Sequence, residues 1–221
     1  AGQNTQAGGA IAIGQNAGQT NQQTSTIAIG LNAATNTQGS DSIAIGTQSG
    51  QYNQGQSSIA VGQGAGNTFQ GTFCVAIGVQ AGSSTQGNAA IAIGQTAGLI
   101  KQGSNAVAIG THAGENTQAN LAVAIGINAG CTVQANAAIA IGSYAGGITQ
   151  GVNAIAIGPN AGQTTQGTSA IAIGNATGQT SQSNNAIAIG VNSGAISQST
   201  NAIAIGNAAG RTSQGGSSIA V

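Results

Sequence analysis

The stretch from Asn153 to Gly174, NAIAIGPNAGQTTQGTSAIAIG, contains one full period of the repeat that makes up this chain. If Ala10 is position 1, the 221 residues divide into thirteen units of sixteen, preceded by nine residues and followed by four, without insertion or deletion. Position 3 is always Ala, positions 2 and 4 are Ile or Val, position 5 is Gly and position 13 is Gln. A constant period means that each unit fills the same volume and stacks on the next. The repeat therefore predicts a solenoid with one coil per unit.

Each unit carries the signals of two short strands and two turns. Sixteen residues are too few for a helical hairpin, and the Ile-Ala-Ile-Gly core is β-branched and alternates with period two. We expect a first strand at positions 1–4, a turn at 5–9, a second strand at about 10–13 and a Gly-rich turn at 14–16. The sequence predicts an all-β parallel β-solenoid, or β-roll, of about fourteen coils over residues 1–221, roughly 65 Å long at about 4.8 Å per coil.

The charged residues indicate which side chains of the second strand face water. Lys101, Glu115 and Arg211 all fall at positions 10 and 12, so we expect these two positions to point outward. Strand alternation then predicts that positions 11 and 13 point inward, including the Ile residues that recur at position 11, such as Ile100 and Ile148.

Position 13 would place a column of buried Gln side chains along the solenoid. A single buried amide is costly, but amides stacked at the coil spacing can hydrogen-bond to one another as a ladder. The alternative, that each Gln caps a local turn through its backbone, stays open. The predicted ladder consists of Gln22, Gln38, Gln54, Gln70, Gln86, Gln102, Gln118, Gln134, Gln150, Gln166, Gln182, Gln198 and Gln214.

Position 5 would place a glycine in the turn after each first strand, where φ can be positive. These predicted turn glycines are Gly14, Gly30, Gly46, Gly62, Gly78, Gly94, Gly110, Gly126, Gly142, Gly158, Gly174, Gly190 and Gly206.

The first strand is apolar on both faces, which predicts a partner outside the coil. Ile or Val alternates with Ala or another small residue, and no copy carries a charge on either face. Strands buried on both sides have this pattern, whereas strands with one wet face alternate apolar with polar residues. One face can line its own coil, although the pattern does not say which. The other would leave an apolar strip far larger than monomers expose, so we expect the chain to form a homo-oligomer.

Composition excludes several classes of function. Two acids, two bases and a net charge of zero offer no basic patch for nucleic acid and no attraction to a charged membrane surface. No apolar run approaches the roughly 18 residues of a membrane span, so we expect no membrane insertion in this chain. A single histidine, His112, cannot supply a nucleophile–base–acid set, and we expect neither an enzyme nor a cofactor.

His112 and Glu115 lie three residues apart, but no second His or Asp column surrounds them, so we predict no metal site. Cys74 and Cys131 are more than three coils apart, about 17 Å along the axis, which is beyond the reach of a disulfide. We expect both thiols to be free.

The segments NAIAIGPNAG (Asn153 to Gly162) and NAVAIGTHAG (Asn105 to Gly114) resemble the head repeats of YadA-type trimeric autotransporter adhesins. Similar repeats occur in phage and large-virus fibre proteins. The resemblance covers essentially the whole chain and implies a left-handed parallel β-roll, a homotrimer with a shared apolar core, and a cell-surface or virion-surface location. The constant sixteen-residue length and the invariant Gln depart from that family's pattern.

Together these observations predict the structural rod of an extracellular or virion-surface fibre or adhesin. A receptor, if there is one, would bind at a tip or at the variable positions 6, 7, 10 and 12. Two alternatives stay open: a self-polymerising filament, because coil ends are open sheet edges, and an ice-binding solenoid, which would need a regular outward Thr array. The chain begins and ends within a repeat without caps, so we expect it to be part of a longer protein.

Overall fold

A computed structural model describes all 221 residues, 1–221, and its only regular secondary structure is β-strand. The chain forms an all-β parallel β-solenoid of about fourteen turns that repeat every sixteen residues, as the period predicts. It divides into two compact units, Ala1–Thr111 and His112–Val221.

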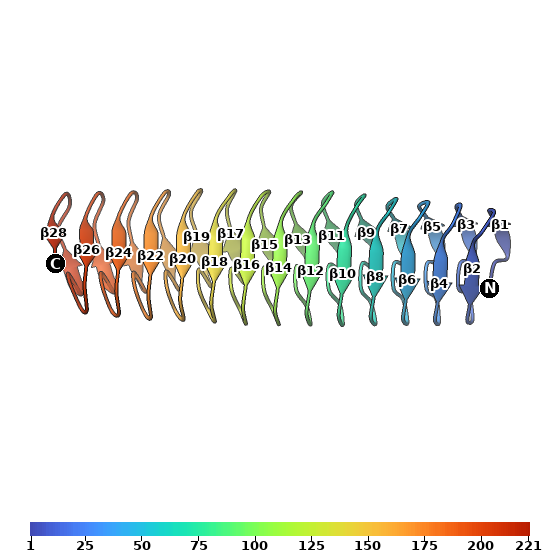
Figure 1. Cartoon of the computed structure of the whole chain (residues 1–221), viewed down its shortest axis with the longest axis horizontal. Coiled ribbons are helices and arrows are strands. Elements are labelled where there is room, and N and C mark those ends of the chain that lie inside the picture. Colours follow the sequence, from blue (N-terminus) through green and yellow to red (C-terminus); the bar gives the residue numbers. More distant parts are fainter. The chain divides into compact units, whose positions relative to one another are not determined.

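In the first unit, each coil contributes one strand to each of two parallel sheets (Figure 1). The even-numbered strands carry the Ile/Val-Ala-Ile/Val sequence and the odd-numbered strands end in Gln. The even-numbered strands are β2 (Ile11–Ile13), β4 (Ile27–Ile29), β6 (Ile43–Ile45), β8 (Ile59–Val61), β10 (Val75–Ile77), β12 (Ile91–Ile93) and β14 (Val107–Ile109). The odd-numbered strands are β1 (Asn4–Gln6), β3 (Thr20–Gln22), β5 (Asn36–Gln38), β7 (Tyr52–Gln54), β9 (Phe69–Gln70), β11 (Thr85–Gln86) and β13 (Lys101–Gln102).

The second unit has the same organisation. Its even-numbered strands are β16 (Val123–Ile125), β18 (Ile139–Ile141), β20 (Ile155–Ile157), β22 (Ile171–Ile173), β24 (Ile187–Ile189), β26 (Ile203–Ile205) and β28 (Ile219–Ala220). Its odd-numbered strands are β15 (Thr117–Gln118), β17 (Val133–Gln134), β19 (Thr149–Gln150), β21 (Thr165–Gln166), β23 (Ser181–Gln182), β25 (Ile196–Gln198) and β27 (Thr212–Gln214).

The pairing register places identical positions of the repeat on top of one another. Strands β18 and β20 pair in parallel, with Ala140 opposite Ala156, and β19 and β21 pair with Gln150 opposite Gln166. A shift of one residue would turn every side chain to the opposite face, so the alternation in the even-numbered strands holds this register.

The interior of the coils is built from small residues and Gln. The Ala side chains at position 3, such as Ala140 and Ala156, are fully buried, as are the mostly small residues at positions 1 and 8. The largest fully buried side chains are all Gln at position 13. The Ile and Val side chains at positions 2 and 4 lie outside this interior and are half-buried or exposed.

The prediction for position 11 is wrong. Ile100, Ile148 and Ile196 do not face inward but are 48%, 49% and 45% exposed, whereas Gln at position 13 is buried as expected. Alternation requires an extended strand, and the odd-numbered strands are too short to provide it. Most begin only at position 12, and in the three-residue strands the middle residue, such as Asn53 or Ser197, has a φ of 53° or 56° in the left-handed region. Position 11 therefore points to solvent.

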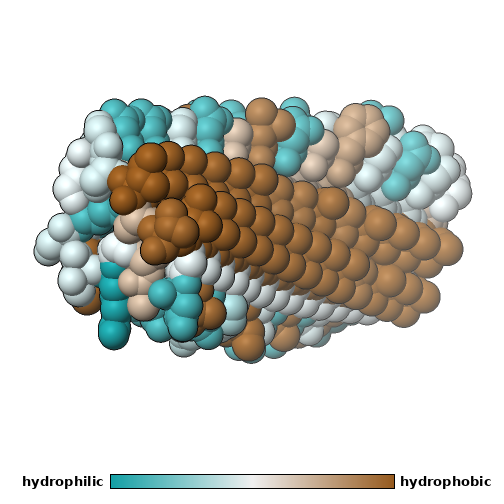
Figure 2. Space-filling model, turned by 60° about the vertical axis from the view of Figure 1, so that its left-hand side comes forward, coloured by the Kyte–Doolittle hydropathy of each residue, from teal (hydrophilic) through white to brown (hydrophobic).

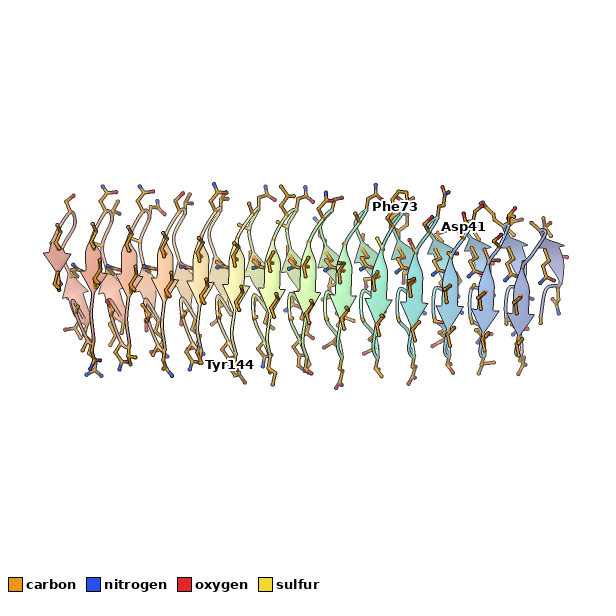
Figure 3. All side chains as sticks on the ribbon, in the orientation of Figure 1. Asp41, Phe73 and Tyr144 are labelled. Carbon is orange, nitrogen blue, oxygen red and sulfur yellow. The ribbon has the colours of Figure 1, made fainter.

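The corners of the coil depend on left-handed backbone at positions 7 and 16. Asp41 and Phe73 occupy position 16 with φ of 59° and 60°, and Tyr144 occupies position 7 with φ of 58°. Their side chains project from the turns in Figure 3. Asn tolerates this conformation better than most residues, which accounts for its frequent use at both positions, for example Asn128 and Asn160.

Candidate functional site

The outward side chains at positions 2 and 4 of the even-numbered strands form an apolar surface on each unit, which we call the Ile/Val face. Because Ala at position 3 lines the coil interior, the larger β-branched residues point to the exterior. Most are half-buried by their neighbours above and below, while Ile77 and Ile189 remain 38% and 37% exposed. Figure 2 shows closely packed rows of hydrophobic side chains bordered by more polar residues.

The Ile/Val face has no charge within it, since all four charged side chains belong to other positions. Lys101 lies at position 12, Glu115 and Arg211 at position 10, and Asp41 at position 16. The structure thus settles which face of the first strand lines the coil: the small residues do, and the large ones are left facing outward. The face is therefore an uncharged apolar surface larger than the isolated apolar residues that monomers usually expose.

Each buried Gln connects the two strands of its own coil. Gln150 Nε2 donates to the main-chain oxygen of Ile139 in the opposite strand at 2.6 Å and to that of Ala154 at the start of the next coil at 3.3 Å. The same amide donates to Oε1 of Gln166 at 3.1 Å. One side chain therefore ties the second strand to the first, to the next coil and to the next Gln.

The Gln–Gln bonds run differently in the two units. In the second unit they join every consecutive pair from Gln118 to Gln214, at 3.1–3.2 Å. In the first unit Gln22 donates to Gln38 and Gln70 donates to Gln86. The Oε1 atoms of Gln54 and Gln70 accept no hydrogen bond there, although Gln54 still donates to the main-chain oxygens of Ile43 and Ser58. Bonds to the main chain therefore accompany the Gln column in both units.

The position-5 glycines lie in the turn after each even-numbered strand, where successive coils approach closely. Gly158 has a φ of 120°, and a Cβ on it would lie 2.5 Å from the carbonyl oxygen of Gly174 in the next coil. The position-9 glycines leave space for the buried Gln side chains, since a Cβ on Gly146 would lie 2.8 Å from Oε1 of Gln150. Only glycine leaves room for the neighbouring backbone at position 5.

Three polar side chains, of His112, Glu115 and Cys131, lie together in the second unit. His112 Nδ1 lies 3.0 Å from Glu115 Oε2, and the Cys131 thiol donates to the same oxygen at 3.6 Å. Burial and the Glu115 carboxylate raise the pKa of Cys131 to about 11, so its thiol is protonated at neutral pH. A protonated thiol is a weak nucleophile, and this cluster does not supply the activated thiolate of a cysteine enzyme.

Cys74 lies in the first unit at position 1, buried between strands. Its thiol donates to the main-chain oxygen of Gly87 at 2.9 Å, and burial raises its pKa. Both cysteines are free, as predicted. No group of three or more His, Cys, Asp and Glu side chains in residues 1–221 could hold a metal ion. No helix in the structure has the length and hydrophobicity to cross a membrane.

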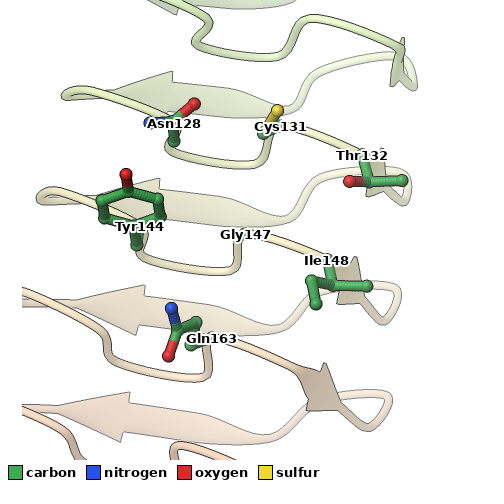
Figure 4. A pocket seen from close by; sticks show the side chains of 7 residues that line it. All are labelled: Asn128, Cys131, Thr132, Tyr144, Gly147, Ile148 and Gln163. Atoms are coloured by element: carbon green, nitrogen blue, oxygen red, sulfur yellow. The ribbon is translucent and has the colours of Figure 1, made fainter.

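A pocket of about 270 Å³ opens on the second unit beside the turn between β18 and β19 (Figure 4). Tyr144 and Gly147 come from one coil, with Asn128 and Cys131 on the preceding coil and Gln163 on the following one. The other lining residues are Thr132 and Ile148. Sequence reasoning missed this pocket, although the signal was present: this coil has the only Gly at position 10 and the only aromatic residue at position 7.

The fold and the burial pattern define the chain as a tandem-repeat parallel β-solenoid. Its interior holds small residues and Gln, and its Ile and Val side chains form an outward face. No protein-family model matches the chain, and no curated protein matches it in sequence.

Proposed function

We propose that this chain is a structural rod of an extracellular or virion-surface fibre or adhesin, and that copies associate through the Ile/Val face. The single observation that carries the proposal is that the small Ala side chains, rather than Ile and Val, occupy the coil interior. The Ile and Val side chains of every first strand are thereby left on the outer surface, covered only in part by their neighbours above and below.

The free energy available on this face is of the order that association requires. Complete burial of an Ile or Val side chain is worth about 1.5–3 kcal/mol, so covering the third that remains exposed is worth roughly 0.5–1 kcal/mol each. The second unit has seven coils with two such residues each, or fourteen in all, which sums to about 7–14 kcal/mol. Association costs about 4–15 kcal/mol in lost freedom, so the gain from covering this face is of the same order as the cost.

The absence of charge from the face favours a second copy of the same chain as the partner. A hetero-partner selected by electrostatics would require charges at the contact, whereas obligate homo-oligomer interfaces are depleted of them at their core. The resemblance to YadA-type head repeats favours three copies, and it is also the basis for proposing a cell-surface or virion-surface location.

The test is the molar mass of the purified chain in solution, measured by light scattering coupled to size-exclusion chromatography. We expect one discrete oligomer, of three chains if the resemblance holds. Replacing Ile141, Ile157 and Ile173 by Thr keeps the β-branch but removes apolar surface from three consecutive coils, and is expected to shift the population toward monomer.

The matched control is the same triple change at Ile100, Ile148 and Ile196, which are exposed but lie at position 11, off the Ile/Val face. Thr already occupies position 11 in other coils, so these changes should leave the molar mass unchanged. A wild-type chain that stays monomeric at every concentration would refute the proposal. Open-ended polymers of increasing length would instead favour the self-polymerising filament.

A further inference from the structure

The pocket beside Tyr144 departs from the repeat at two positions of the same coil. Position 10 is Gln in several coils, including the two that follow, but here it is Gly147, which leaves a hollow between Cys131 of the preceding coil and Gln163 of the following one. Position 7 is Asn in the coils on either side, but here it is Tyr144. One coil thus creates a cavity and places an aromatic ring at its edge.

The fold itself does not account for Tyr144. Its φ of 58° lies in the left-handed region, which bulky side chains disfavour and which the flanking Asn128 and Asn160 adopt at less cost. The ring is also 46% exposed, so burial does not repay that cost. Left-handed backbone occurs at position 7 in the other coils as well, so it is the exposed aromatic ring on the rim of a pocket that points to binding.

The lining has the chemistry of a site for a neutral polyhydroxylated ligand. Asn128 and Gln163 each offer an amide donor and acceptor, and Thr132 offers a hydroxyl group. Tyr144 and Ile148 supply apolar surface. No charged side chain lines the pocket. The Glu115 carboxylate accepts a hydrogen bond from the thiol of the lining residue Cys131, and its negative charge disfavours an anionic ligand.

We propose that this pocket binds a single neutral sugar ring, with one C–H face of the pyranose on the Tyr144 ring and its hydroxyl groups on the amides of Asn128 and Gln163. The volume of about 270 Å³ lies just below the range of roughly 300–1,000 Å³ for drug-sized ligands, which suits a ligand of monosaccharide size. The site lies at positions 7, 10 and 11, separate from the Ile/Val face, and goes beyond the proposed association.

The experiment is saturation-transfer difference NMR on the purified chain with a panel of probes: the methyl glycosides of glucose, galactose, mannose and N-acetylglucosamine. We expect saturation of the ring C–H protons of at least one probe, with a dissociation constant in the millimolar range, because a shallow open site buries one face of a small ligand. The chain has no Trp, so the fluorescence of its two tyrosines gives a second readout.

Two variants restore the standard repeat and should abolish the site without harming the fold. Gly147→Gln fills the hollow with the residue that the next coil has at position 10. The backbone accepts this side chain, because Gly147 does not have a positive φ and the nearest atom to an added Cβ is the Tyr144 main-chain oxygen at 3.2 Å. Tyr144→Asn replaces the ring with the residue best suited to the backbone. Each should weaken binding at least about tenfold, the equivalent of 1.4 kcal/mol.

The control is Tyr52→Asn, which removes the other tyrosine from position 11 of a coil in the first unit and should leave binding unchanged. The proposal is overturned if no probe shows saturation transfer, or if binding persists at full strength in both pocket variants. Molar mass measured on the same samples separates this outcome from failure of the proposed association.

Discussion

Replacing one Gln of the buried column tests what holds the coils together. We predict that Gln150→Leu, which preserves side-chain volume but removes every hydrogen bond of the amide, lowers the free energy of unfolding of the second unit. The change withdraws a donor from the main-chain oxygens of Ile139 and Ala154 and from Oε1 of Gln166. No other hydrogen bond to that buried Gln166 oxygen is present in the structure.

The magnitude follows from the groups left without partners. A buried polar atom that loses its only hydrogen bond costs about 1–3 kcal/mol, and the two main-chain oxygens add smaller losses. We expect about 2–5 kcal/mol in total. Gln54→Leu is the matched comparison, because Gln54 makes the bonds to its own coil and the next but donates none to Oε1 of Gln70, which has no partner, and accepts none from a neighbouring Gln. It should be less destabilising by about 1–3 kcal/mol.

Amide hydrogen exchange read peptide by peptide is the suitable assay, because repeat arrays open locally and need not unfold in one step. Protein concentration must be the same throughout, since association would raise apparent stability. We expect faster exchange centred on β18–β21 for Gln150→Leu. Equal effects of Gln150→Leu and Gln54→Leu would show that the Gln–Gln bonds add nothing beyond the bonds to main chain. An effect of Gln150→Leu below about 0.5 kcal/mol would refute the reasoning altogether.

Four further predictions concern the turns, the Cys131 thiol and the corrected position 11. Gly158→Ala should lower the free energy of unfolding, measured by heat or urea, by more than about 3 kcal/mol, because its Cβ would lie 2.5 Å from the backbone of the next coil. Gly215→Ala, with no atom within 4 Å of the added Cβ, should stay within about 1 kcal/mol of wild type. Similar losses for the two variants would contradict the close approach of Gly158 to the next coil. Alkylation of Cys131 at pH 8 should be about a hundredfold slower than in the unfolded chain, because raising the pKa from 9.0 to about 11 lowers the thiolate fraction by that factor, and Glu115→Gln should accelerate it. The raised pKa means that the fold favours the neutral thiol of Cys131. The contribution of this thiol to the free energy of unfolding is therefore present below about pH 9 and is lost as the pH rises toward 11. Urea titrations at about pH 8 and about pH 10.5 would detect the loss. Ile196→Thr should change the free energy of unfolding by less than about 0.5 kcal/mol, as expected for a surface residue. A loss above about 2 kcal/mol would mean that position 11 is buried.

The cavity at Tyr144 shows how a nearly uniform repeat can acquire a local site. Two substitutions in one coil, a smaller residue at position 10 and a larger one at position 7, are enough to break the regular surface. Because neighbouring coils hold the surrounding backbone in place, such changes alter one coil without disturbing the rest. The variable positions of the repeat can therefore carry binding while the invariant ones keep the fold.

Much of the architecture follows from the sequence alone. The constant period of sixteen residues, the β-branched Ile/Val-Ala-Ile/Val segment and the glycines at position 5 determine one coil per repeat, two short strands per coil and parallel in-register stacking. Each of these features is local or repeats at a constant interval, so it can be read without knowledge of distant contacts. The burial of Gln at position 13 also followed from the pattern, because the charged residues at positions 10 and 12 marked the outward side of the second strand.

Only the tertiary structure decided which way the side chains point and where the repeat is broken. The first strand is apolar on both faces, so its pattern could not distinguish an Ala interior from an Ile interior. In the structure the small residues of this strand are buried inside the coil together with the Gln column. Position 11 turns outward because left-handed residues and very short strands interrupt the alternation that the pattern assumes. The pocket at Tyr144 joins residues from three successive coils, and their spacing exists only once the coils are stacked.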